Sequence, residues 1–208
     1  MNEHHLQLDN IRISLEGRQL LVLDAEIRGG EVLTVMGPSG VGKSSLLAYL
    51  AGFLAPAFEA TGLVRLDGVQ LNDLPAEQRH VGLLFQDALL FPHLSVGGNL
   101  RFALPAATFD KAARVEQALA SIGLEGFAMR DPETLSGGQR SRVALQRLLL
   151  SEPRAVLLDE PFSRLDTHLR REVREFVFAG LKVAGLPAIM VTHDAEDAEA
   201  AGGRVIQL

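Results

Sequence analysis

The segment Glu31–Phe53, EVLTVMGPSGVGKSSLLAYLAGF, contains the pattern that decides the fold. Its first residues are short and mostly apolar, and they predict a strand that ends before Gly37 and Pro38. The residues from Lys43 onward have the spacing of a helix, with Gly52 as its end. Between them, GPSGVGKS matches the pattern G-x-x-x-x-G-K-[ST] in full, and its glycines let backbone N–H groups point at phosphates.

This turn predicts a role for each of its polar residues. Lys43 is expected to reach the β- and γ-phosphates of a nucleotide, and Ser44 is expected to ligate Mg²⁺. A glycine-rich turn that arose by chance is the alternative, and the strand before it and the helix after it argue against that alternative. The residues predicted to hold the nucleotide here are Gly37, Pro38, Ser39, Gly40, Val41, Gly42, Lys43, Ser44 and Ser45.

Three further short apolar runs predict strands, and they are His80–Gln86, Arg154–Glu160 and Ala188–Asp194. Near-continuous apolar strands separated by helical segments are typical of a parallel sheet that is covered on both faces. Residues 1–30 and 61–79 contain alternating runs that favour antiparallel strands, whereas 87–150 reads as helical. We therefore predict one α/β domain over 1–208 of the P-loop NTPase type. It has a mostly parallel core sheet, an antiparallel β subdomain and an inserted helical subdomain at about 87–150.

Polar residues follow the predicted strands at the edge where ligands bind in such sheets. Asp159 is expected to meet Mg²⁺, usually through water, and Glu160 to polarise the attacking water. His193 could bond the γ-phosphate, and the Gln86 amide could touch Mg²⁺ or the water. Each has an ordinary alternative, since strand ends often carry solvated acids, a lone His is more often structural, and Gln86 by itself reads as exposed. The four strand ends at one edge favour the functional interpretation.

Composition narrows the class of partner. The formal net charge is −6 and there is no cysteine, which disfavours a nucleic-acid partner and excludes a disulfide framework or a thiolate metal site. The longest apolar stretch, at 46–58, is too short to span a bilayer, and the N-terminus has no signal pattern. The sequence thus predicts a cytosolic protein whose role at a membrane would require a partner.

A second glycine-bearing turn lies in DPETLSGGQRSR, Asp131–Arg142, directly before an apolar run that reads as a helix. The N-terminus of a helix carries partial positive charge and free N–H groups, so this turn can also hold an anion. The simpler interpretation is that Ser136 caps the helix and that the glycines form a loop.

Taken together, these motifs resemble those of the ATP-binding subunit of an ABC transporter over nearly the whole chain. They occur in family order: GPSGVGKSS as Walker A, LLFQD as the Q-loop, LSGGQR as the signature, AVLLDEP as Walker B, FSRLD as the D-loop and VTHD as the H-switch. The segments Gln86–Leu100 and Thr192–Ala200 look most like the importer branch. Because the chain ends soon after His193, it resembles the short form without a C-terminal regulatory domain.

The resemblance implies that two such subunits, a homodimer or a pair of ATPase subunits, bind head to tail with ATP between them. The residues implied for catalysis are Glu160, His193, Lys43 and Gln86. The residues implied as ligands of Mg²⁺ are Ser44, Gln86 and Asp159. The signature residues would contact the partner's γ-phosphate, and they are Ser136, Gly137, Gly138 and Gln139. It also implies an integral-membrane permease, an indirect solute-binding protein, no nucleic acid, and a peripheral location on the cytoplasmic side of the inner membrane.

Three other functions remain open at this point. A non-transport ABC ATPase of DNA repair or translation would share the motifs, but the interval between Gln86 and Leu135 leaves no room for a long coiled coil. An ordinary P-loop kinase or GTPase would not need LSGGQ or His193. A regulatory module with degenerate ATPase residues is disfavoured by the intact Lys43 and Glu160.

One departure from the family pattern concerns the base of the nucleotide. The family usually stacks adenine on an aromatic residue about 22 residues before the phosphate-binding turn, which here corresponds to Leu15 or, with a shift of one residue, to Ser14 or Glu16. No Phe, Trp or Tyr precedes Tyr49. Base–aromatic stacking is worth about 1–3 kcal/mol. We therefore expect weaker adenine binding and laxer base selectivity here than in relatives.

Overall fold

The strand, turn and helix expected from 31–53 are present in the computed structural model, which describes residues 4–38 and 40–208. Ser39, one of the predicted nucleotide-binding residues, lies outside the described residues. Strand β3 (Val32–Met36) leads through the turn into α1 (Lys43–Ala51). The helix begins after Gly42, whose φ of 103° is a conformation that L side chains rarely adopt. The glycine is therefore required by the backbone of the turn.

A five-stranded parallel sheet runs through the centre of the molecule, in the order β6-β7-β8-β3-β9. Its strands β3, β7 and β8 consist almost entirely of buried residues, which explains their continuous apolar runs. The short edge strand β9 was not expected from the sequence. The four strands other than β3 are β6 (Val81–Leu84), β7 (Ala155–Asp159), β8 (Ala188–Thr192) and β9 (Val205–Gln207).

A second, antiparallel sheet confirms the expectation for the N-terminal third of the chain. Its order is β2-β1-β4-β5. Buried residues alternate with more exposed ones along much of β1, as expected of a strand with one face on a core. The strands are β1 (His5–Leu15), β2 (Arg18–Arg28), β4 (Phe58–Leu66) and β5 (Val69–Gln70).

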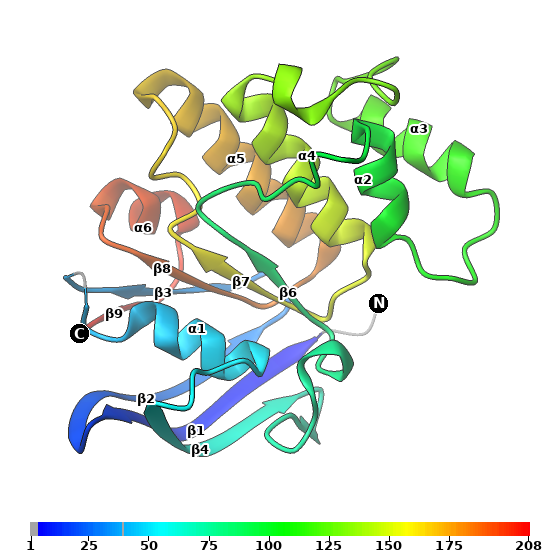
Figure 1. Ribbon diagram of the computed structural model, residues 1–208. Helices are drawn as coiled ribbons and strands as arrows, with labels where there is room; N and C mark the ends of the chain where they lie inside the picture. Colours follow the sequence, from blue (N-terminus) through cyan, green and yellow to red (C-terminus); the bar gives the residue numbers. More distant parts are fainter. Residues whose placement is uncertain (1–3, 39) are drawn as a thin grey trace.

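Helices complete a layered α/β structure (Figure 1), in which α1 lies between the two sheets and the other helices lie beyond the opposite face of the parallel sheet. Two single-turn 3₁₀ helices cover Ala76–Gln78 and Pro132–Thr134. The remaining α-helices are α2 (Val96–Ala103), α3 (Lys111–Ser121), α4 (Gly137–Leu150), α5 (Thr167–Ala184) and α6 (Ala195–Ala201).

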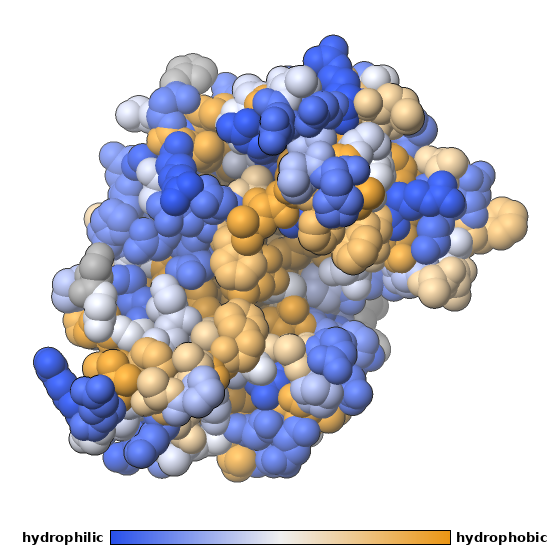
Figure 2. Space-filling model, in the orientation of Figure 1, coloured by the Kyte–Doolittle hydropathy of each residue, from blue (hydrophilic) through white to orange (hydrophobic). Residues whose placement is uncertain are grey.

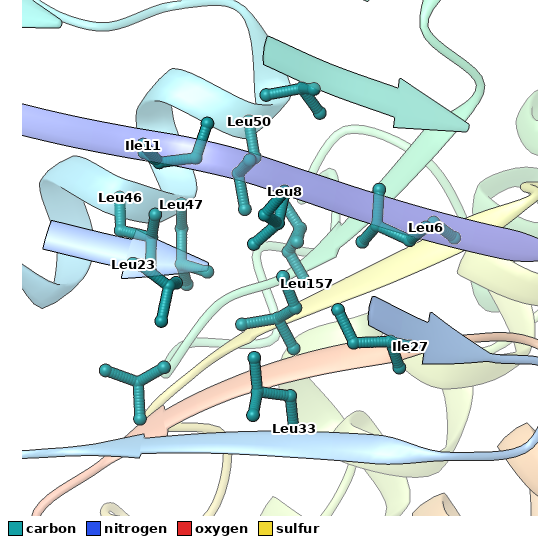
Figure 3. Packing of buried hydrophobic residues seen from close by; sticks show 14 of the residues in the cluster. Leu6, Leu8, Ile11, Leu23, Ile27, Leu33, Leu46, Leu47, Leu50 and Leu157 are labelled. Carbon is teal, nitrogen blue, oxygen red and sulfur yellow. The ribbon is translucent and has the colours of Figure 1, made fainter. Parts of the chain in front are cut away.

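The largest core cluster lies around α1. Figure 3 shows Leu46, Leu47 and Leu50 of this helix in one cluster with Leu8 of β1 and Leu157 of β7. These side chains are almost fully buried. Burial of each contributes about 1.5–3 kcal/mol relative to exposure, so α1 is held firmly against both sheets.

The segment between β6 and β7 contains α2, α3 and α4, and no strand occurs in it among the described residues. These helices share a core of their own, which includes Leu100, Leu119 and Val143. The signature helix α4 also packs on α5 and β6, so the helical segment is joined to the parallel sheet along this helix.

Candidate active site

The carboxyl ends of β7 and β8 bring the predicted acidic residues and the predicted histidine together. Because these strands are parallel neighbours, Asp159 pairs with Val191, two residues before His193. His193 Nδ1 lies 3.2 Å from Glu160 Oε1. The Ser44 hydroxyl, at the start of α1, donates to Asp159 Oδ1 at 3.2 Å. Side chains far apart in the sequence thus form one contiguous polar group.

Among the described residues, no side chain caps the backbone N–H groups at the start of α1. Its N-cap residue is Gly42, which has no side chain to accept from the first N–H groups of the helix. A cavity of about 270 Å³ opens at this position. The N-terminus of α1 therefore has the features of an anion site, namely free N–H groups, a favourable helix dipole and open space.

Lys43 lies over this turn and is 6% exposed. Its Nζ donates to the carbonyl oxygens of Gly37 at 2.7 Å and of Pro38 at 2.9 Å. A buried ammonium needs such partners, and phosphate oxygens of a ligand would offer it stronger, charged acceptors at the same place.

Glu160 has an unusual backbone. Its φ is 44°, in the left-handed region that non-glycine residues rarely adopt. The conformation is fixed on both sides, because Glu160 N–H donates to Val191 O at 3.0 Å and Glu160 O accepts from the Ser163 hydroxyl at 2.9 Å. Glu160 follows Asp159 directly, so this strained backbone lies next to the Ser44–Asp159 pair. Strained residues of this kind are typical of functional sites.

The charge state of Asp159 is set by its surroundings. Burial raises the pKa of its carboxyl, and the neighbouring charge of Glu160 raises the pKa further. The hydrogen bond from Ser44 and the charge of Lys43 lower the pKa and partly offset these effects. A divalent cation at this place would favour the ionised carboxylate.

The residues present suit Mg²⁺ rather than a metal held in a complete protein cage. Ser44 and Asp159 offer hard oxygen ligands side by side. Among the described residues, no group of three or more His, Asp or Glu side chains could hold a metal. Mg²⁺ in nucleotide sites is usually bound by one or two protein oxygens together with substrate phosphates, and the arrangement fits that pattern.

Gln86 is the predicted site residue that lies apart from this group. Strand β6 ends at Leu84, so Gln86 follows it in a loop and is exposed. In the described part of the chain, no hydrogen bond joins it to the other predicted site residues. Its neighbour Asp87 forms an ion pair with Arg164, so the loop after β6 is tied to the segment after β7.

Comparison with known proteins shows the family of the chain. The family model described as ABC transporter matches residues 20–163. The chain belongs to the ABC transporter family. It is 48% identical over 198 residues to the uncharacterised ABC transporter ATP-binding protein YnjD of Escherichia coli K12, a match that covers 94% of this chain and 91% of that protein.

Two further relatives are import proteins. The thiamine import ATP-binding protein ThiQ of Jannaschia sp. is 44% identical over 207 residues, which is 98% of this chain and 88% of ThiQ. The spermidine/putrescine import ATP-binding protein PotA of Oleidesulfovibrio alaskensis is 43% identical over 187 residues. That match covers 88% of this chain, which spans only about half (49%) of PotA.

As a member of this family, the chain is the ATP-binding ATPase subunit of a transporter and acts with a separate membrane permease. In the part of the chain that the structure describes, none of the helices has the length and apolar character needed to cross a membrane.

The ABC signature turn is both a helix cap and an exposed helix N-terminus. The Ser136 hydroxyl accepts from Gln139 N–H at 3.3 Å, and Gln139 Oε1 accepts from Ser136 N–H at 2.9 Å, which forms a capping box. The simpler interpretation of Ser136 as an N-cap is therefore correct for the isolated chain. Gly138 packs closely on α5, since a Cβ there would lie 2.4 Å from Leu169 Cδ1 and the Leu169 side chain would have to move.

The sequence reasoning missed a charged cluster that holds the H-switch of this ABC subunit. Arg170 and Arg174, one turn apart on α5, both donate to Asp194, the residue after His193. Arg174 also pairs with the buried Asp197, which accepts from the Thr192 hydroxyl at 2.9 Å. The only signals in the sequence were two arginines four residues apart and the acidic run after His193.

Arg170 connects this cluster to the D-loop. It donates to the backbone oxygen of Leu165 at 3.0 Å as well as to Asp194 at 3.0 Å. The Arg170 side chain therefore contacts both the segment after β7 and the segment after β8.

Arg174→Met is expected to lower the free energy of unfolding by roughly 3 kcal/mol, because it leaves the Asp197 carboxylate buried without its ionic partner. The Arg174 and Asp197 side chains are only 8% and 3% exposed. Urea denaturation measures the change. The matched control is Arg171→Met on the same helix, whose pair with Glu175 is 83% and 69% exposed and is worth about 0.5 kcal/mol or less. Equal losses in the two variants would contradict this assignment.

Proposed function

We propose that the chain binds ATP with Mg²⁺ at the N-terminus of α1 and hydrolyses it with Glu160 as the residue that orients and activates water. The observation that carries the proposal is the placement of two pairs next to each other, Ser44 with Asp159 and Glu160 with His193. One pair has the chemistry to hold a metal and the other has the chemistry to handle a proton and a phosphate.

Each residue has a separate task in this proposal. The ammonium of Lys43 exchanges its two carbonyl acceptors for phosphate oxygens. Glu160 orients the attacking water and takes up its proton, while the contact with His193 fixes the carboxylate and brings the imidazole toward the γ-phosphate. Mg²⁺, when bound, neutralises phosphate charge; Ser44 and Asp159 would hold it, with Gln86 reaching it or the water from the loop after β6.

Asp159→Asn is expected to weaken Mg²⁺ binding in the presence of ATP by roughly 10- to 100-fold, since the carboxylate next to Ser44 is lost. ATP affinity in excess EDTA should stay within about twofold, because the backbone of the turn is unchanged. Calorimetric titration measures both quantities. Asp73→Asn, a change at an exposed acid distant in sequence from the site, is the control and should alter neither. If Asp159→Asn also lost ATP binding in excess EDTA, Asp159 would support the fold of the turn and would not act through Mg²⁺.

The signature turn serves, we propose, the nucleotide of a second subunit. The first turn of α4 lies beyond one face of the parallel sheet, whereas α1 lies against the other face (Figure 1). Among the described residues that line the cavity at the N-terminus of α1, none belongs to the signature turn of the same chain. A head-to-tail dimer would bring Ser136, Gly137, Gly138 and Gln139 to the γ-phosphate held by the partner, where the dipole of α4 favours it.

An apolar groove beside the Q-loop is the surface that we propose for the permease. A cavity of about 330 Å³ lies between β6, the loop after it, α2 and α4, and Phe91 forms part of its lining. Figure 2 shows hydrophobic residues gathered across the middle of this face. The exposed apolar side chains at the groove include Phe85 and Phe102, and Leu89 of the same loop is also exposed. A docked partner would cover them and would sense the loop that contains Gln86.

The cargo is proposed from the relatives. The names of ThiQ and PotA describe them as import proteins for thiamine and for spermidine/putrescine, and we infer import of a small solute here. Such import places the chain on the cytoplasmic side of the inner membrane, with a solute-binding protein acting on the permease from the opposite side. Mg²⁺-dependent release of phosphate from ATP by the purified chain tests the proposed ATP hydrolysis. A chain that neither binds Mg·ATP nor releases phosphate would contradict the proposal.

A further inference from the structure

The cavity at the N-terminus of α1 has an apolar wall opposite its phosphate-binding side. The turn and the first residues of α1 form one side of it, from Gly40 to Ser45, together with Glu160. The antiparallel sheet supplies the other side through Leu15 of β1, Leu20 of β2 and Phe58 of β4. A molecule with a polar phosphate end and a flat, less polar end would match the two sides.

Phe58 supplies an aromatic ring next to Leu15, the position at which the sequence lacks the ring that is usual in the family. Leu15 and Phe58 are directly opposite each other in the antiparallel pair of β1 and β4, which lie side by side beneath α1 (Figure 1). Opposite residues of such a pair point to the same face, with Cβ atoms about 4.5–5.5 Å apart. The ring of Phe58 therefore lies beside Leu15 on the face that borders the turn.

The other nearby aromatic residues do not occupy this wall. Tyr49 is turned elsewhere, because its hydroxyl donates to Gly62 O at 3.1 Å and accepts from Asn72 at 2.7 Å. Phe53 and Phe85 line an adjoining cavity of about 310 Å³, which shares Ser44, Ser45 and Phe58 with the cavity at α1. Among the described residues that line the cavity at α1, Phe58 is thus the one aromatic side chain, and it is half-buried.

We propose that Phe58 provides the surface on which the base of the bound nucleotide stacks, in place of a ring at position 15. The assignment rests on the proposed ATP site. With the phosphates at the N-terminus of α1, the nucleoside extends toward the wall formed by Leu15, Leu20 and Phe58. Gly42 keeps this wall close to the turn, since a Cβ on it would lie 3.2 Å from Leu20 Cβ.

This assignment changes the expected affinity but not the expected selectivity. A phenyl ring stacks on any base and has no hydrogen-bonding group to distinguish adenine from guanine. The base therefore contributes to affinity despite Leu15, which revises the expectation of weak binding. ATP and GTP should bind with similar strength.

Calorimetric titration of the full chain with ATP, GTP and inorganic tripolyphosphate tests the role of the ring. Phe58→Leu should weaken ATP and GTP binding by roughly five- to hundredfold and leave tripolyphosphate binding unchanged. Phe53→Leu changes a residue that lines the adjoining cavity and not the cavity at α1, and it should leave all three unchanged. Adding Leu15→Tyr to Phe58→Leu should restore ATP affinity, because it places a ring on the opposite strand of the same wall.

The outcomes are distinguishable. If Phe58→Leu left ATP binding unchanged, or weakened ATP and tripolyphosphate equally, the stacking assignment would be wrong while the ATP site stood. If the wild-type chain bound neither ATP nor tripolyphosphate, the proposed ATP site itself would fail.

Discussion

Glu160→Gln is expected to lower the steady-state rate of ATP hydrolysis by roughly 10²- to 10⁴-fold, while ATP affinity stays close to that of the wild type. An amide keeps the size of the carboxylate and can still contact His193, but it cannot take the proton of the attacking water. The constrained backbone at Glu160, with φ at 44°, does not depend on the side-chain charge. Phosphate release and calorimetric ATP binding measure the two effects.

Glu116→Gln is the control, because Glu116 is an exposed carboxylate on α3, away from the strand ends. Its rate should equal the wild-type rate. Since the Glu160→Gln variant binds ATP without consuming it, we also expect ATP to hold it as dimers. Hydrolysis at the wild-type rate by the Glu160 variant would show that another group activates the water.

Gly137→Asp is expected to weaken ATP-driven dimerisation by roughly a hundredfold or more, and to leave ATP binding to the monomer intact. A carboxylate at this position would face the γ-phosphate of the partner's nucleotide, and like charges in contact cost several kcal/mol. The site accepts a side chain, because a Cβ on Gly137 would lie 3.6 Å from Leu165 Cδ2 and 3.7 Å from Leu169 Cδ2. An acid in the first turn of α4 also favours the helix dipole, so the fold is not weakened.

Gly137→Asn separates charge from size, since it has the same shape without the charge, and it should dimerise more readily than the Asp variant. Both changes are made in the Glu160→Gln background, and light scattering with and without ATP reports the dimer. Gly138 is less suitable for this test, because a side chain there would displace the Leu169 side chain. Loss of ATP binding by the Gly137→Asp monomer would place the signature turn at its own chain's nucleotide.

Local patterns predicted the elements of the site well, since each depends on neighbouring residues. The predicted strand Arg154–Glu160 is observed as Ala155–Asp159, and the helix predicted at Gly138–Leu150 begins one residue earlier, at Gly137. The strand predicted at His80–Gln86 is shorter, ending at Leu84. Gln86 is for this reason in a loop and not at the end of a strand.

Features that join distant segments were not predicted from the sequence. No local pattern shows that Phe58 pairs with Leu15, because the register of β1 and β4 depends on how their buried faces pack on α1. The contact of Arg174 with Asp197 likewise depends on α5 packing beside α6. The capping box at Ser136 could be read from the sequence, since both partners lie within one turn.

The sequence by itself predicted the glycine-rich turn before α1 and the residues that we propose for catalysis. Both follow from local requirements, such as a glycine where φ is positive and a lysine and a serine at the start of a helix. Only the tertiary structure decided that Glu160 contacts His193 and that Phe58 borders the cavity at the N-terminus of α1. These contacts depend on which strands are neighbours and in what register, and that choice is made by burial of the apolar faces of the whole chain.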